Sequence, residues 1–129
     1  RRGARASTIA HDAHSIGVVG GDDADMALAA NRLRDIGGGQ VAVVGGRVVA
    51  ELACPIGGLL SDGSAEEVAA EARALQAACR ELGVILPAAF MTMSFLALSV
   101  LPELRITDRG LVDVLRFELV DLDARSRKP

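Results

Sequence analysis

The segment from residue 40 to residue 52 constrains the fold of this 129-residue chain more than any other. Two runs rich in β-branched residues, 41–44 and 47–52, are separated only by Gly45 and Gly46. Such runs favour extended strands, and a two-residue glycine turn is a common connection between antiparallel strands. The segment therefore predicts a β-hairpin.

Two amphipathic helices are predicted, one on each side of the hairpin in the sequence. Asp22 can cap the first helix, and the glycines at 37–39 end it. Ser64 and Glu67 form a capping box at the start of the second helix, and Gly83 ends it. The buried faces should consist of Met26, Ala29, Ala30, Leu33 and Ile36 in the first helix, and of Val68, Ala72, Leu75, Cys79 and Leu82 in the second.

Further strands are expected before and after these elements. A buried strand is predicted around residues 16–19, and one or two more within 111–122, with Phe117 and Leu119 on one face, after a turn at 107–110. The total of four to six strands and two main helices predicts an α+β fold, in which the helices pack on one mixed β-sheet as a single pair of layers.

The uncharged segment 84–101 is nearly as long as a membrane-spanning helix. Pro87, three hydroxyl side chains and the lack of nearby basic residues argue against a span, so a buried loop and short helix are expected.

The domain is expected to cover residues 7–122, with a leader at 1–6 and a tail at 123–129.

Composition excludes several classes of partner. The chain has three Phe, no Trp, no Tyr and a net charge of −3, which argues against nucleic-acid binding because that needs stacking rings and a basic surface.

Cys54 and Cys79 belong to no paired-cysteine motif, and Cys79 is interpreted as a small core residue. Reduced thiols favour a cytoplasmic protein, and no membrane partner is expected.

The two histidines of the chain, His11 and His14, flank Asp12 in the sequence. On a helix both rings would share a face and could bind a metal together with Asp12, whereas on an extended chain they would point in opposite directions. The alternative is a pair of histidines hydrogen-bonded at a domain edge, which the residues alone favour. The glycines at 17–21 and 37–39 lack the order of a phosphate-binding loop and are interpreted as turns. The residues therefore predict no self-sufficient active site.

Five segments occur together in an order that is specific to one family. They are STIAHDAHS at 7–15, DMALAANRL at 25–33 followed by GGG at 37–39, PIGGLLSD at 55–62, MTMSFLAL at 91–98 and PELRITDRGLVDV at 102–114. This set resembles the adenine deaminase family over about residues 6–122. The resemblance is to the C-terminal domain of that family.

The resemblance implies an amidohydrolase that converts adenine and water to hypoxanthine and ammonia. A (β/α)-barrel in such enzymes binds divalent metals, typically manganese or iron, which activate the water. The matched region follows the barrel, so this chain is expected to hold no cofactor and to be inactive alone. Its expected partners are the barrel, adenine in the whole enzyme, and further copies in a homo-oligomer.

The resemblance also suggests a role for His11, Asp12 and His14, which are expected to close or orient the purine pocket. The alternative is that this segment only braces the interface with the barrel. The chain departs from the family pattern at Ala13, Ser15 and Ser99, which bears on activity in the whole enzyme. Two other functions stay open: a free-standing α+β interaction or assembly domain, and a small metalloprotein using the His11–His14 segment.

Overall fold

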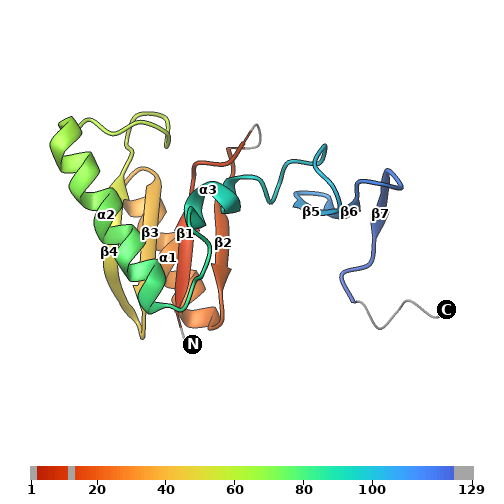
Figure 1. The fold of residues 1–129 in the computed structure, drawn as a ribbon, viewed down its shortest axis with the longest axis horizontal. Helices are drawn as coiled ribbons and strands as arrows, with labels where there is room; N and C mark the ends of the chain where they lie inside the picture. Colours follow the sequence, from red (N-terminus) through yellow and green to blue (C-terminus); the bar gives the residue numbers. More distant parts are fainter. Residues whose placement is uncertain (1–2, 12–13, 124–129) are drawn as a thin grey trace.

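The computed structural model describes residues 3–11 and 14–123 and divides them into a main body and a small C-terminal sheet (Figure 1). The α+β class is confirmed. The elements, in chain order, are β1 (Ala4–Ser7), β2 (Gly17–Gly20), α1 (Asp23–Asp35), β3 (Gly39–Val44), β4 (Arg47–Ala53), α2 (Ala65–Glu81), α3 (Ala89–Ser94), β5 (Leu104–Thr107), β6 (Gly110–Asp113) and β7 (Glu118–Val120).

The main body is built on a four-stranded sheet in the order β2-β1-β3-β4, with every pair antiparallel. The predicted hairpin is confirmed as β3 and β4, with Gly45 and Gly46 in the turn between them. The helices α1 and α2 cover opposite faces of this sheet (Figure 1). One mixed sheet in a single pair of layers was expected, and three layers with an antiparallel sheet are found instead.

The inner strand β1 begins within the segment that was expected to be a leader. Residues 4–6 were expected to belong to a leader, yet they pair with both β2 and β3. Ala4 and Ala6 are fully buried under α1, and Arg5 is buried on the opposite face. Two alanines are small enough to let the helix approach the sheet closely, so residues 4–6 form part of the folded core.

The first helix is placed by its cap and by a tertiary contact of its first turn. Asp22 accepts a hydrogen bond from the backbone N–H of Asp25 at 3.1 Å, as its capping role predicts. The buried carboxylate of Asp25 in turn accepts hydrogen bonds from the backbone N–H groups of Gly45 and Gly46, at 3.1 and 2.6 Å. The helix therefore holds the hairpin turn directly, while its Leu33 is buried against β1 and β3.

The second helix begins with the predicted capping box, in which Ser64 and Glu67 hydrogen-bond each other's backbone N–H groups. Leu75 is almost fully buried under this helix, together with Cys79. Both cysteines are buried free thiols, and burial raises the pKa of Cys79 and of Cys54. The interpretation of Cys79 as a small core residue is confirmed.

The C-terminal sheet, in the order β5-β6-β7, lies apart from the main body, and no residue from Phe95 to Asp123 is buried (Figure 1). The expected buried loop at 84–101 is confirmed only in α3, because Ile85 is 95% exposed. Phe117 precedes β7 with a positive φ of 60° and is exposed, so it does not share a strand face with Leu119. In the part of the chain that is described, no helix combines the length and the apolar character needed to cross a membrane.

A salt bridge between α1 and β4 predicts how stability depends on pH. Arg32 donates two hydrogen bonds to Glu51, at 2.6 and 2.7 Å, and they lower the pKa of the Glu51 carboxyl. A carboxyl whose pKa is lower in the folded than in the unfolded state stabilises the fold above its unfolded pKa, and this contribution is lost as the pH falls through the folded pKa.

Replacing Glu51 with glutamine is therefore expected to flatten the acid limb of the stability curve. The loss at neutral pH should stay below about 1 kcal/mol, because the pair is partly exposed and screened by solvent. Urea unfolding measured from neutral pH to about pH 3 tests this. Parallel curves for the wild-type and variant proteins would contradict it.

Candidate functional site

Three connections of the main body meet at one end of the four-stranded sheet. They are the loops β1–β2, α1–β3 and β4–α2, at the top of the main body in Figure 1. We call this end the loop edge and define it by residues 8–11, 37–38 and 54–60. It contains residues 8–11 of the STIAHDAHS segment and residues 55–60 of the PIGGLLSD segment, both singled out in the sequence.

Thr8 holds the three connections together. Its hydroxyl accepts a hydrogen bond from the Gly39 N–H at 2.7 Å and donates one to the Gly58 carbonyl oxygen at 2.5 Å. Its own backbone N–H donates to the Gly39 carbonyl at 3.0 Å. A Cβ on Gly38 would lie 2.5 Å from the Gly58 Cα, so the two loops touch through glycine backbone. The loop edge is therefore a single packed unit.

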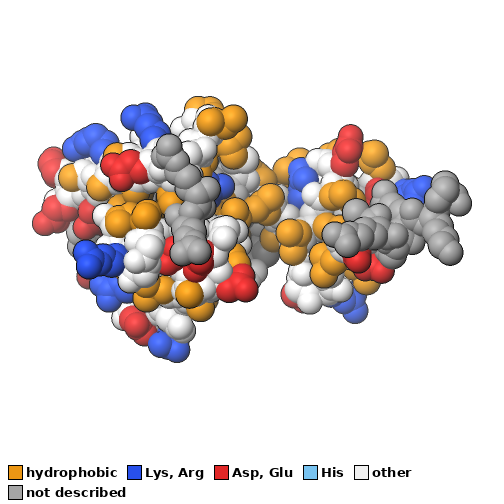
Figure 2. Space-filling view, turned by 90° about the horizontal axis from the view of Figure 1, so that it is seen from below, with side chains coloured by type: hydrophobic (Ala, Val, Ile, Leu, Met, Phe, Trp, Pro, Cys, Tyr) orange, Lys and Arg blue, Asp and Glu red, His pale blue; other side chains and the backbone are white. Residues whose placement is uncertain are grey.

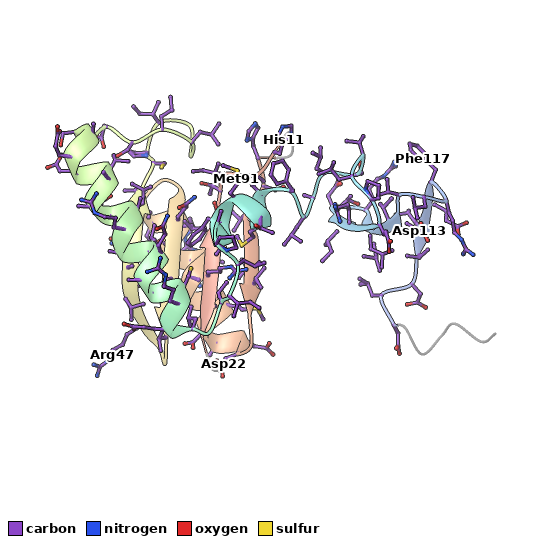
Figure 3. The ribbon with its side chains drawn as sticks, in the orientation of Figure 1. His11, Asp22, Arg47, Met91, Asp113 and Phe117 are labelled. Atoms are coloured by element: carbon purple, nitrogen blue, oxygen red, sulfur yellow. The ribbon has the colours of Figure 1, made fainter. Side chains whose placement is uncertain are left out.

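His11 is held at this edge by α3. Its backbone N–H donates to the Ser94 carbonyl at 2.9 Å, and its ring stacks on Phe95 with centroids 5.6 Å apart and planes inclined by 27°. The imidazole itself is exposed, and Figure 3 shows it above α3, on the side of the main body that faces the C-terminal sheet. The imidazole of His11 is thus exposed and at the same time stacks on the ring of Phe95.

No described contact joins His14 to His11. His14 is exposed and has a positive φ of 43°, a backbone conformation that non-glycine residues adopt rarely. Asp12 lies outside the described residues. No helix forms in the described residues around His11 and His14, so the helical arrangement that would let both rings share a metal is not seen there.

A metal site requires several His, Cys, Asp or Glu side chains close together. Among residues 3–11 and 14–123, no group of three or more His, Cys, Asp and Glu side chains is arranged to hold a metal ion. The predicted metal site at His11, Asp12 and His14 includes one residue outside this range, so it stays a prediction.

Exposed apolar side chains also occur in the loop edge and on α3, the helix that holds His11. Ile56 and Leu60 are exposed in the β4–α2 loop, and Met91 is exposed on α3 (Figure 3). Figure 2 views the molecule from the end opposite the loop edge and shows apolar surface there too, in orange, on both the main body and the C-terminal part. A surface of this kind suits contact with another protein surface, and the imidazole of His11 can accept or donate a hydrogen bond within that contact.

Reasoning from the residues missed two groups that build this site. Thr8 and Phe95 lie in segments singled out for their resemblance, but neither was given a role. Phe95 could have been found as one of three aromatic residues in the chain. Thr8 carried no signal, because its partners Gly39 and Gly58 lie 31 and 50 residues away.

Comparison with known proteins identifies the domain. The family model described as "Adenine deaminase C-terminal domain" matches residues 1–118. The chain belongs to this family. The predicted resemblance is thereby confirmed, and it covers nearly the whole chain.

Relatives in the adenine deaminase family are close in sequence but much longer. Adenine deaminase of Moorella thermoacetica is 57% identical over 122 residues, which make up 95% of this chain and 20% of that protein. The adenine deaminase of Kosmotoga olearia is 51% identical and that of Clostridium botulinum 50%, with 95% of this chain covered in both. The chain thus spans about a fifth of the length of the curated relatives it matches.

Proposed function

We propose that this chain is the accessory C-terminal domain of a metal-dependent adenine deaminase and does not deaminate adenine by itself. The observation that carries the proposal is the family match together with the length of the relatives, four fifths of which lie outside the match. The proposed reaction of the whole enzyme converts adenine and water to hypoxanthine and ammonia, in the cytoplasm. Divalent metal, manganese or iron, would activate the water in the remaining part of that enzyme.

The proposal includes a packing surface for the rest of the enzyme. A three-stranded sheet with no buried residue has little stability of its own in water, so β5-β6-β7 needs a further surface to pack on. The exposed apolar side chains of this unit include Leu104, Ile106, Leu115, Leu119 and Leu122. We assign the deaminase barrel as the partner of this sheet and of the loop edge, because most of each relative's length is available to cover them.

The loop edge is proposed to face the purine pocket of the barrel, with His11 contacting the purine. The support is geometric: His11 is exposed, yet it is fixed by a backbone hydrogen bond and by a ring stack. An exposed imidazole in a fixed position can hydrogen-bond a ring nitrogen of adenine and orient it. A ring that only braces the interface with the barrel would be exposed in this domain as well, so turnover is the measurement that separates the two roles.

A chimeric enzyme tests this role. The matched segment of the Moorella thermoacetica deaminase is replaced by this chain, and His11 is changed to alanine. Loss of one oriented hydrogen bond should lower kcat for adenine by about tenfold, with the thermal midpoint of unfolding little changed.

The matched control is Arg73→Ala, which removes an exposed side chain on α2, outside the loop edge. It should leave kcat unchanged. Equal turnover of the His11 variant and the control would contradict the pocket role. Hypoxanthine production by the purified 129-residue chain alone would overturn the wider proposal.

A further inference from the structure

We infer that Phe95 is the positioning residue for His11, holding the imidazole in the orientation that the purine requires. The inference rests on the proposed function of His11 for its catalytic consequence. Its structural part concerns a ring contact within this chain and can be tested without any activity.

The contacts of α3 supply the first step. Ala89 and Met93 are buried, which fixes this short helix to the main body. The Ser94 hydroxyl donates to the Met91 carbonyl at 2.7 Å and closes the last turn. Phe95 is the C-cap residue, so its ring projects from a helix end whose position is already set.

The second step is that two contacts act on different parts of His11. The hydrogen bond to the Ser94 carbonyl restrains the backbone, and the stack on Phe95 restrains the ring. An exposed histidine samples several rotamers, and each rotamer places the ring nitrogens elsewhere. Restraining backbone and ring together selects one of these arrangements before substrate binds, which reduces the ordering that binding requires.

The third step compares the three phenylalanines of the chain. Phe90 packs against the core beneath α2, and Phe117 is exposed in the turn before β7. Only Phe95 stacks on another ring among the described residues. Core packing alone therefore does not explain the position of the Phe95 ring. Its stack on His11, the candidate substrate-orienting residue, does explain it.

Nuclear magnetic resonance of the 129-residue chain tests the contact. The ring protons of His11 lie against the face of Phe95 and should resonate upfield of those of His14, which has no described ring contact. Phe95→Leu should remove most of this difference, and Phe95→Tyr should preserve it. Phe117→Leu, the same substitution at an exposed ring outside the contact, should leave it unchanged. His11 signals that are identical in wild type and Phe95→Leu would overturn the inference.

Kinetics of the chimeric deaminase test the consequence. Loss of an aromatic stack should lower kcat by about threefold to tenfold in Phe95→Leu, and Phe95→Tyr should restore it. In a His11→Ala background, Phe95→Leu should cause little further loss, because the residue to be positioned is gone.

The two failures are distinguishable. A His11→Ala enzyme with unchanged turnover would refute the proposed pocket role of His11. The resonance experiment would still decide whether Phe95 contacts His11. A His11→Ala enzyme that loses turnover while Phe95→Leu does not would refute the positioning role alone. Additive losses in the double variant would also refute it, since they would show that Phe95 acts independently of His11.

Discussion

Replacing Gly39 with alanine is expected to lower the free energy of unfolding by about 4 kcal/mol, the largest effect of any substitution considered for this domain. Gly39 begins β3, an inner strand. Its φ is +128°, a backbone conformation that residues with a Cβ rarely adopt. A Cβ there would overlap the carbonyl oxygen of Leu52 and lie 3.0 Å from the Cys54 nitrogen. The neighbouring atoms are backbone of the paired strand and its continuation, so they cannot move aside without breaking the ladder.

Urea unfolding followed by circular dichroism measures this effect, and Gly57→Ala is the matched control. Gly57 also has a positive φ, +64°, but a Cβ there would have no atom within 4 Å. The control should therefore lose only the backbone cost of about 1 kcal/mol. Equal losses in the two variants would show that the close approach of β3 and β4 is not what requires glycine at residue 39.

Replacing Thr8 with valine is expected to cost about 3 kcal/mol and to loosen the loop edge. Valine has nearly the shape of threonine, so the change removes the hydroxyl without creating a large cavity. The buried N–H of Gly39 loses its acceptor and the carbonyl of Gly58 loses its donor. Both groups then lose their partner in a partly buried region, where water replaces the hydroxyl only incompletely.

Two measurements separate the effects of Thr8→Val. Urea unfolding gives the loss of global stability, and amide hydrogen exchange of Gly39 reports the broken contact locally. Thr8→Ser keeps the hydroxyl and should retain most of the protection and most of the stability. Protection of the Gly39 amide that is equal in Thr8→Val and wild type would contradict the assigned network.

Several parts of the fold could be predicted from the residues because their signals are local. Gly45 and Gly46 define a hairpin turn, and Asp22, Ser64 and Glu67 define two helix starts, all through contacts within a few residues. The buried stripes are also local patterns, which is why Leu33 and Leu75 were expected in the core where they lie. The candidate site was predicted only in part: His11 is placed at a loop edge, but its partners were not foreseen.

In the C-terminal part of the chain, local sequence patterns predicted a turn but not how the strands pair. The turn at 107–110 was predicted and lies between β5 and β6. The same alternating pattern did not show that these strands form a separate sheet, because alternation describes which side chains share a face and not which strand lies alongside. Phe117 was placed on a strand by that pattern and lies outside it.

The sequence by itself determined the hairpin, the two long helices and the family, since caps, turns, apolar periodicity and ordered motifs all depend on neighbouring residues. Only the tertiary structure decided that residues 4–7 form an inner strand, that Asp25 holds the hairpin turn, and that α3 supports His11. Each of these includes contacts between residues at least 20 positions apart. Such contacts depend on how all elements pack together, which no short stretch of sequence specifies.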